Sequence, residues 1–399
     1  MKAIQKILII LYCLPVVLDA QSSEFFMQAK AKLDYNQLDS ALFYINKAIN
    51  EEPSVKYFMF RGKLFFDLKR YDEALSDFNF IESKEPGMAS FYIAKIYALQ
   101  KKTDMAVNWL LIHLNSKYKK PKSIIRTDEA FNSIRNEKKY QDIWLKDWYS
   151  DYEIAIESVI YYINNDELVH AIEEFDNIFQ NYSPTGELYF ERALVYIKLE
   201  DYKNALKDLE NAIKLNSENY EYHNTRAKVY LEMKRYKKAL KEYNVAINLN
   251  NTNPTDYYNR GVAYYKLQMF NEALEDFTYY LKFYDKDETA YYYAGQIYNI
   301  TGDYNKALIY LNKLLSLNKG IADYYIERIK AYEGLENYTQ MLIDCNNALD
   351  LDPKNGLIFY KRGIAKLNMK DTDGACKDWA NAIRNGYFDA NEYIHSYCK

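Results

Sequence analysis

Histidines and paired carboxylates are residues whose types could bind a metal or support acid-base catalysis in this chain. The chain has only four histidines, and none has a ligand partner at the spacing that a zinc site requires. The sequence contains no phosphate-binding loop, no GxSxG nucleophile elbow and no catalytic cysteine context. Acidic pairs such as Glu173-Glu174 lie among alternating charges, which is typical of a solvated helix face. We therefore expect no enzymatic activity, no cofactor and no metal.

A fixed period of 34 residues organises the second half of the chain. The periodic tyrosines are Tyr162, Tyr196, Tyr230, Tyr264, Tyr298 and Tyr332. The alanines with the same period are Ala171, Ala205, Ala239, Ala273, Ala307 and Ala375, with Met341 in the place of one alanine. A 34-residue period indicates stacked helical hairpins.

Each period contains two amphipathic helices and a short turn. Residues 255–271, TDYYNRGVAYYKLQMFN, place apolar and aromatic side chains at helical spacing, and the following NEALEDFTYYL does the same. Equivalent turns read LEDYKN, MKRYKK, ITGDYNK and LENYTQ. We expect Gly, Asn or Asp to reverse the chain in these turns.

This pattern resembles the tetratricopeptide repeat (TPR), a helix-turn-helix unit with preferred residues at eight places. Numbered from one, a unit has small residues at positions 8, 20 and 27 and large ones at 4, 11, 17 and 24. The units that begin at Val55 and Pro254 match these places, with Gly62 and Gly261 at position 8. The resemblance implies an all-α, right-handed superhelical solenoid with a C-terminal capping helix. It also implies that the periodic tyrosines, at position 11, belong to the core.

The repeats form two arrays in this interpretation. We expect about three repeats in residues 21–114, a divergent helical cap or linker in 115–150, about seven repeats in 151–387 and a capping helix in 388–399. In the third repeat His113 stands where alanine is expected, and a bulky residue there predicts a looser junction. Phe131, Ile134, Tyr140, Ile143 and Trp144 are expected to dock on the open end of the front array. The run KYKKPK is read as a solvated linker rather than a partner patch.

Three cysteines lie in the last repeats. Cys345 falls on an inward position and is expected to be a small buried hydrophobic residue. The segment around Cys376 and Cys398 resembles the tail of repeat proteins from Gram-negative envelopes. In an oxidising compartment we expect these two cysteines to form a disulfide that pins the cap, and two free thiols are the alternative. Tyr393, Ile394 and Tyr397 offer the cap an apolar side.

The first twenty residues predict export. Lys2 and Lys6 precede an apolar run from Ile7 to Leu18, and Ala20 is a suitable small residue before a cleavage point, so we read residues 1–20 as a signal peptide. A membrane anchor needs about 20 apolar residues, and this run is shorter and contains Pro15. Acylation of Cys13 is disfavoured because Tyr12 precedes it. The predicted location is the periplasm or cell envelope of a Gram-negative bacterium, with no integral membrane segment after cleavage.

Charge excludes nucleic acid as the expected partner. The 52 Lys and Arg balance 56 Asp and Glu, the signs are interspersed, and nucleic-acid binding needs a concentrated basic face. The mean hydropathy of −0.48 with 49% hydrophobic residues indicates a folded, soluble chain.

The resemblance also implies a concave groove that binds a protein partner. In the family, positions 2, 5, 9 and 12 of the first helix face this groove. Tyrosine suits such a surface because it supplies a rigid apolar face and a hydroxyl, although tyrosine is abundant throughout the chain. The predicted partner-binding residues are Asn224, Lys228, Tyr258, Val262, Tyr265, Tyr292, Gln296, Asn299 and Tyr360.

One known partner class can be tested on the sequence. The segment YYNRGVAYYKL resembles the middle unit of family members that hold the carboxyl terminus of a chaperone, with Asn259 at the matching place. The neighbouring units do not match, because the places that need Lys, Asn, Lys and Arg hold Asn224, Lys228, Tyr292 and Gln296.

Three functions remain open at this point. The first is a non-enzymatic, exported scaffold whose groove binds a peptide or helix of an envelope protein. The second is a structural spacer or assembly factor of an envelope or secretion complex that uses its outer faces. The third, an enzyme with an unrecognised site, would carry a bound cofactor or metal when purified.

Overall fold

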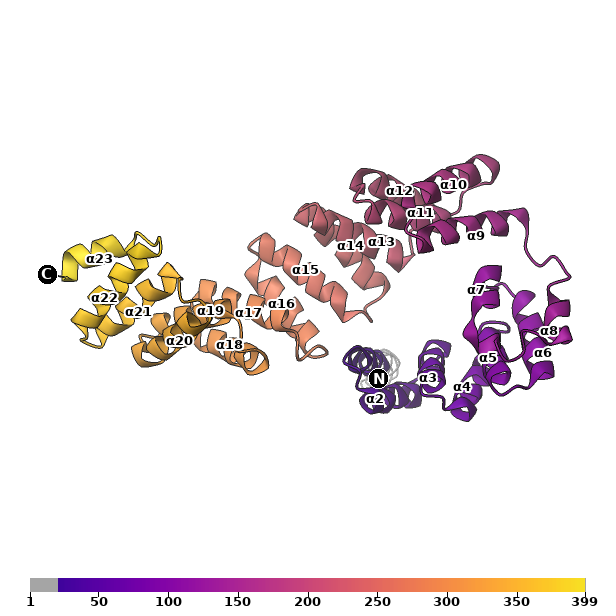
Figure 1. Ribbon diagram of the computed structural model, residues 1–399, viewed down its shortest axis with the longest axis horizontal. Coiled ribbons are helices and arrows are strands. Elements are labelled where there is room, and N and C mark those ends of the chain that lie inside the picture. Colours follow the sequence, from indigo (N-terminus) through magenta and orange to yellow (C-terminus); the bar gives the residue numbers. More distant parts are fainter. Residues whose placement is uncertain (1–20, 399) are drawn as a thin grey trace, which may run out of the picture. The chain divides into compact units, whose positions relative to one another are not determined.

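The computed structural model describes residues 21–398, and every regular element within this range is helical (Figure 1). The expected signal peptide and Cys13 lie outside the described residues. The all-α solenoid predicted from the 34-residue period is therefore confirmed. None of the helices in residues 21–398 is long and apolar enough to cross a bilayer.

The front part of the chain forms helical hairpins followed by short helices. Residues 21–34 are helical and precede α2. The following elements are α2 (Leu38–Glu51), α3 (Val55–Asp67), α4 (Tyr71–Lys84), α5 (Ser90–Leu99), α6 (Thr103–Leu114), α7 (Lys122–Thr127), the 3-10 helix η1 (Glu129–Phe131) and α8 (Lys138–Ile143).

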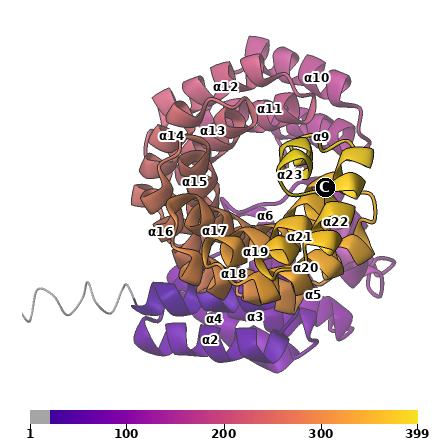
Figure 2. The same cartoon turned by 90° about the vertical axis from the view of Figure 1, so that its left-hand side faces the viewer.

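The rear part repeats one hairpin at the predicted period. Its helices α9 to α12 lie side by side in two perpendicular views (Figures 1 and 2). The elements are α9 (Asp151–Asn164), α10 (Leu168–Asn181), α11 (Gly186–Lys198), α12 (Tyr202–Leu215), α13 (Tyr220–Glu232), α14 (Tyr236–Leu249), α15 (Pro254–Lys266), α16 (Phe270–Leu281), α17 (Glu288–Thr301), α18 (Tyr304–Leu317), α19 (Ala322–Gly334), α20 (Tyr338–Leu351), α21 (Gly356–Asn368), α22 (Thr372–Arg384) and α23 (Ala390–Tyr397).

The described chain divides into two compact units. Unit 1 runs to Met233 and includes Asn244–Asn253, and unit 2 comprises Lys234–Tyr243 and the chain from Pro254 onward. The domain boundaries drawn from the sequence pattern remain predictions.

A left-handed residue reverses the chain inside each rear hairpin. The residues with positive φ are Asp166, Glu200, Lys234, Gln268, Gly302, Glu336 and Lys370, one every 34 residues. In the four turns named above, only Gly302 is of the expected type. Asp201 and Asn337 instead accept a hydrogen bond from a backbone N–H at the start of the second helix, so they are N-caps. The turn expectation was wrong because these side chains satisfy helix ends.

The alanines of the 34-residue pattern are core residues. Those from Ala171 to Ala375 are fully buried, and so is Met341. Small residues at position 8 allow close packing: a Cβ on Gly363 would lie 2.4 Å from Nε1 of Trp379. The periodic tyrosines, however, are only half-buried. The ring of Tyr332 lies beside the Arg328 guanidinium, 5.7 Å from ring centroid to Cζ. Tyr332 also packs against a buried core cluster, as do Tyr162, Tyr264 and Tyr298, so these tyrosines lie at the edge of the core rather than fully inside it.

That arginine belongs to a repeated ion pair, the Arg–Asp clamp. Arg at position 7 donates two hydrogen bonds to Asp at position 23 of the same repeat, at 2.6–2.9 Å. Arg328 also donates to Asn312 of the preceding repeat, so one guanidinium joins three helices. The clamped pairs are Arg61–Asp77, Arg192–Asp208, Arg260–Asp276, Arg328–Asp344 and Arg362–Asp378. The aspartates are nearly fully buried, which makes each pair costly to break.

The junction at His113 is tight, contrary to the expectation of a loose one. The imidazole is 1% exposed, and its Nε2 accepts a hydrogen bond from the backbone N–H of Lys120 at 3.0 Å. Its Nδ1 lies 3.3 Å from Oγ of Ser90, which itself donates to the carbonyl of Gly87. Burial lowers the pKa of His113 to about 4, so the ring is neutral. A bulky side chain is accommodated here because both ring nitrogens have partners.

The segment after His113 packs as expected on the front array. Phe131, Ile134, Tyr140 and Ile143 are buried in one cluster with Phe91 and Leu110. The basic run is not fully solvated, however. Lys119 donates to the backbone oxygen of Trp148 at 2.6 Å and pairs with Glu153 at 2.8 Å. This lysine is therefore a structural contact within unit 1.

The C-terminal helix α23 covers the last repeat. The ring of Tyr393 packs on buried Trp379 at 5.0 Å between centroids, and Ile394 joins the same cluster. Tyr397 lies at the edge of the cap and is half exposed. A disulfide joins Cys376 of α22 to Cys398, whose Cα atoms are 5.7 Å apart. Cys345 is fully buried, as expected for a small hydrophobic residue.

Candidate functional site

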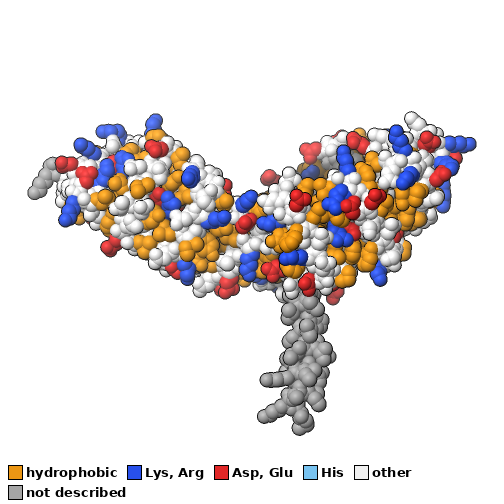
Figure 3. Space-filling view, turned by 90° about the horizontal axis from the view of Figure 1, so that it is seen from below, with side chains coloured by type: hydrophobic (Ala, Val, Ile, Leu, Met, Phe, Trp, Pro, Cys, Tyr) orange, Lys and Arg blue, Asp and Glu red, His pale blue; other side chains and the backbone are white. Residues whose placement is uncertain are grey.

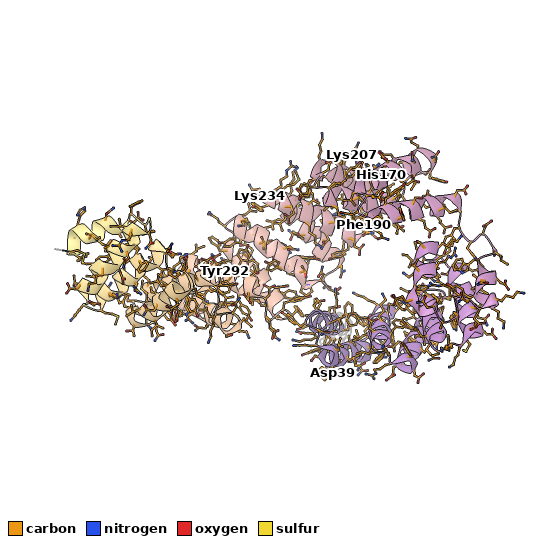
Figure 4. All side chains as sticks on the ribbon, viewed as in Figure 1. Asp39, His170, Phe190, Lys207, Lys234 and Tyr292 are labelled. Carbon is orange, nitrogen blue, oxygen red and sulfur yellow. A yellow bond between two sulfur atoms is a disulfide. The ribbon has the colours of Figure 1, made fainter. Side chains whose placement is uncertain are left out.

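The positions expected to face a groove differ between the two units. They are positions 2, 5, 9 and 12 of the first helix in the repeats that begin at residues 152, 186, 220, 254, 288, 322 and 356. Phe190 of α11 in unit 1 and Tyr292 of α17 in unit 2 occupy the same position 5 (Figure 4). On the face shown in Figure 3, side chains of both charge signs are interspersed, in agreement with the balanced composition.

In unit 2 the predicted tyrosines pack on other aromatic rings. Tyr258 lies 5.0 Å from Tyr280, Tyr265 lies 4.9 Å from Tyr293, and Tyr292 lies 5.6 Å from Tyr324, measured between ring centroids. Tyr258, Tyr265 and Tyr292 are all half-buried. Each ring is therefore partly covered by a neighbouring ring and keeps part of its surface exposed.

Burial also affects the hydroxyls of these tyrosines. It raises the pKa of Tyr292 to about 12, with a further contribution from Glu327 and Asp323. The pKa of Tyr258 is raised by burial as well, and by Asp287. Both side chains stay neutral near pH 7, so they can donate a hydrogen bond but cannot act as general bases.

The predicted residues Tyr265, Gln296 and Asn299 are brought together around Glu327. The Tyr265 hydroxyl donates to Oε1 of Gln296 at 3.1 Å, and Nε2 of Gln296 donates to Glu327 at 3.1 Å. Asn299 donates to the Glu327 carboxylate at 3.1 Å, and Lys330 donates at 2.9 Å. We call this set the Glu327 network. The glutamate is 4% exposed, and its charge is already matched by these donors.

A shallow cavity of about 490 Å³ opens above the Glu327 network. Its lining includes Tyr265, Gln296 and Asn299, together with Ile300 and Tyr304. Sequence reasoning missed Glu327 because position 6 is outside the expected groove positions. The Arg at position 7 beside it gave no signal that the glutamate would be buried.

The other predicted residues have separate surroundings. Asn224 is 4% exposed and donates to the hydroxyl of Tyr220 at 2.9 Å. Lys228 is exposed on the same helix, and Val262 is half-buried against the aromatic cluster of unit 2. Tyr360 packs on Tyr387 and on Tyr393 of the cap. Partner binding by these residues remains a prediction.

Unit 1 contains a deeper cavity that sequence reasoning did not single out. Its volume is about 530 Å³, and we call it the unit 1 cavity. One wall consists of Ile156, Ile160 and Ile163 of α9, which are positions 5, 9 and 12 of their repeat. The opposite wall consists of Phe190 of α11 and Tyr222 of α13, whose ring centroids lie 5.0 Å apart.

Carboxylates surround this apolar cavity. Glu187, Glu191 and Glu221 line it and are exposed. Within the described residues none of the three forms an ion pair. Glu153 also lines the cavity, but it pairs with Lys119, the only lysine of the lining. Four glutamates and one lysine give the lining a formal charge of −3.

The pKa of Glu191 is raised above its ordinary value. Surrounding protein atoms raise the pKa of Glu191 although its side chain is open to solvent, and the charges of Glu221 and Glu187 raise it further. A signal for this site was present in the sequence. The repeats that begin at residues 152 and 186 hold glutamate at position 2 and isoleucine, leucine or phenylalanine at positions 5, 9 and 12. The groove residues predicted from the sequence all lie in later repeats.

No metal centre is found in the part of the chain that the structure describes. No three His, Cys, Asp or Glu side chains in residues 21–398 are placed to share an ion.

Comparisons with known proteins agree with the repeat register. Models described as tetratricopeptide repeat match residues 186–219 and 288–320, and one described as TPR repeat matches residues 227–268. Two of the matches begin at residues 186 and 288, which are predicted repeat starts. No curated protein matches the chain.

Several solved structures are similar to the chain. The C-terminal part of a TPR repeat-containing protein from Cytophaga hutchinsonii has 19% identity and a TM-score of 0.50, covering 61% of this chain and 98% of its own. A tetratricopeptide repeat protein from Parabacteroides merdae has 22% identity and a TM-score of 0.43, covering 61% of this chain and 97% of its own. The repeat matches and the helical hairpins lead to one conclusion: the chain is built from tetratricopeptide repeats and folds as a helical solenoid of this type.

Proposed function

We propose that this chain is a non-enzymatic scaffold that binds a peptide or helix of a partner protein in its groove. The observation that carries the proposal is the unit 1 cavity, where groove positions hold apolar side chains that no other part of the described chain covers completely. Buried periodic residues form the core, whereas Ile156, Ile163 and Phe190 pack on its edge and keep part of their surface open. An open apolar surface with polar edges is typical of a protein-binding site.

Capture of the partner tests this proposal. The mature chain is cross-linked in cells, isolated and analysed by mass spectrometry, and we expect one or a few proteins to be enriched. Two variants each change one part of the groove. The first is Ile160→Asn in unit 1, and the second combines Tyr258→Ala and Tyr292→Ala in unit 2. Loss of capture in either variant, with an unchanged melting curve, supports groove binding. Capture that survives both sets of substitutions rejects it.

A structural role for the outer faces is the second candidate. Phe43 of α2, Ile309 of α18 and Ile343 of α20 are exposed, Ile309 by 66%, and all three occupy position 22 of their repeats. These side chains lie on the second helix of each hairpin, away from the groove positions. If Ile309→Ser and Ile343→Ser abolish capture while the groove variants retain it, the chain is an assembly factor or spacer.

We also propose export to the cell envelope. The support is the charged and apolar pattern of residues 1–20 together with the disulfide between Cys376 and Cys398, since disulfides persist in oxidising compartments. Fractionation of a Gram-negative host expressing the chain should place it in the periplasm or envelope, with an N-terminus after residue 20. A cytosolic product that retains residues 1–20 would reject this proposal.

A further inference from the structure

The unit 1 cavity combines an apolar interior with uncompensated negative charge. Its aliphatic wall on α9 is long enough to contact a large side chain, and Phe175 of α10 is a buried residue of its lining. The glutamates around it have no cationic partner except at Glu153, which pairs with Lys119. An apolar ligand alone would leave this charge unmatched.

The carboxylates follow the repeat. Glu153, Glu187 and Glu221 are all position 2 of successive repeats, so one carboxylate is supplied every 34 residues along one side of the cavity. The same position holds Thr255, Thr289, Asp323 and Leu357 in later repeats. The row of glutamates is thus restricted to unit 1, where the cavity lies.

We propose that the unit 1 cavity binds a segment of a protein partner in which an apolar side chain is flanked by arginine or lysine. This inference rests on the proposed function and specifies the chemistry of the partner at one part of the groove. The apolar side chain contacts Ile156, Ile160 and Phe190, and the flanking cations pair with Glu187, Glu191 and Glu221. A cation near Glu191 also relieves the repulsion among these carboxylates.

Other ligands fit less well. A divalent cation finds no triad of ligands in the described residues. An acidic or phosphorylated segment is repelled by a lining of charge −3. A small polyamine would satisfy the carboxylates, but it would leave the aliphatic wall without an apolar contact.

A synthetic peptide tests the proposal directly. The probe is a nine-residue peptide with blocked termini, a leucine at its centre and two arginines on each side of the leucine. Its affinity for the mature chain is measured by calorimetry. A second peptide has serine in place of leucine, and a third has glutamates in place of the arginines. We expect binding of the first peptide, weaker binding of the serine peptide and none of the glutamate peptide. Salt should weaken the first interaction as the Debye length falls from about 10 Å toward 3 Å.

Charge-matched variants locate the interaction. The triple variant Glu187→Gln, Glu191→Gln and Glu221→Gln should weaken binding by about tenfold or more, because it removes three charge pairs. The control variant Glu173→Gln, Glu218→Gln and Glu232→Gln makes the same change in net charge at exposed positions outside the cavity. It should alter the affinity by less than about twofold. Both variants should keep the melting temperature of the parent protein.

Several results would overturn the proposal. If the two triple variants lose the same affinity for the peptide, the effect is one of net charge. If the leucine and serine peptides bind with equal affinity, the central side chain makes no apolar contact in the cavity. Spermidine that competes at the same concentration as the peptide would assign the cavity to small amines. Absence of peptide binding would also reject it. If the partner captured from cells is lost only in the Tyr258 and Tyr292 variant, groove binding stands and this assignment of the cavity fails.

Discussion

Two glutamates occupy position 6 of their repeats and have opposite surroundings. In unit 2, Glu327 is buried and accepts hydrogen bonds from Gln296, Asn299 and Lys330. In unit 1, Glu191 is exposed, and the charges of Glu221 and Glu187 raise its pKa. The repeat framework is the same at both places. The comparison shows that neighbouring repeats decide whether the glutamate at position 6 is buried in a hydrogen-bond network or left exposed.

The largest expected effect is on stability, and it comes from breaking the Arg–Asp clamp of the repeat framework. Asp344→Ala leaves the half-buried guanidinium of Arg328 without its bidentate partner, and we expect a loss of about 3–5 kcal/mol in the free energy of unfolding. Glu174 stands at the same position 23 in the first rear repeat, where position 7 is Ser158 and no clamp exists. Glu174→Ala should cost less than about 0.5 kcal/mol.

Denaturant unfolding followed by circular dichroism measures both values. Similar costs for the two substitutions would show that the clamp adds no stability. The clamp would then not belong to the framework that the repeats of both units share. Differences between the grooves of unit 1 and unit 2 could then not be assigned to the residues at the groove positions alone.

Acid should destabilise unit 1 through His113. The pKa of this buried ring is lowered to about 4 from its ordinary value of 6.5, so the unfolded chain binds the proton more tightly. Stability is therefore complete above pH 6.5 and is lost as the pH falls toward 4, by about 3 kcal/mol. Unit 2 contains no equivalent buried histidine among its described residues.

Tryptophan fluorescence reports mainly on unit 1, because Trp109, Trp144 and Trp148 belong to unit 1 and only Trp379 belongs to unit 2. In the His113→Gln variant the acid-dependent loss between these pH values should disappear. A variant that keeps the full pH dependence would assign it to other groups.

Substitution of the glutamate at position 6, once in each unit, tests the comparison of Glu327 with Glu191. Glu327→Leu removes the carboxylate that accepts from the half-buried amide of Gln296 and from Lys330, while Asn299 keeps its bond to the backbone oxygen of residue 327, and we expect a loss of about 1–3 kcal/mol. Glu191→Leu removes a charge that has no cationic partner in unit 1, and it should leave stability unchanged within about 0.5 kcal/mol. Thermal and denaturant unfolding of the two variants provides the measurement. Equal destabilisation would mean that Glu191 is also a structural residue.

The smallest expected effect is the pH dependence of peptide binding at the unit 1 cavity. The raised pKa of Glu191 means that this carboxylate begins to protonate at a higher pH than an ordinary surface glutamate. The groups that face it are Glu187, Glu221 and Tyr222, with the Lys119–Glu153 pair across the cavity. Affinity for the arginine peptide should fall as the pH falls, and the fall should begin at lower pH in Glu191→Gln.

Calorimetry over a pH series would detect this shift. An unchanged pH profile in the Glu191→Gln variant would remove this residue from the cation-binding set, even if the other glutamates remain in it.

The fold was predictable because its signal repeats. Helix starts at Val55 and Pro254 and the burial of the periodic alanines followed from the 34-residue register. The chain reversals were not predictable from residue type, since Glu200, Lys234 and Glu336 adopt the left-handed conformation where glycine, asparagine or aspartate was expected. There the geometry of two packed helices overrides the preference of a single residue.

The candidate site was only partly predictable. The register correctly grouped Tyr265, Gln296 and Asn299, which meet at the Glu327 network. It could not show that Tyr258 packs on Tyr280, or that Glu191 is left without a donor. These properties depend on residues 22 and 30 positions apart in the sequence, and no local pattern records them.

The proposed ligand site lies in unit 1, at the cavity between α9 and α11. A photoreactive diazirine analogue of leucine at the centre of the arginine peptide would mark the contact covalently. After irradiation and digestion, we expect adducts on the segment that contains Ile156 and Ile160 or on the segment that contains Phe190. Adducts confined to α15, α17 or α19, or spread evenly over the chain, would contradict it.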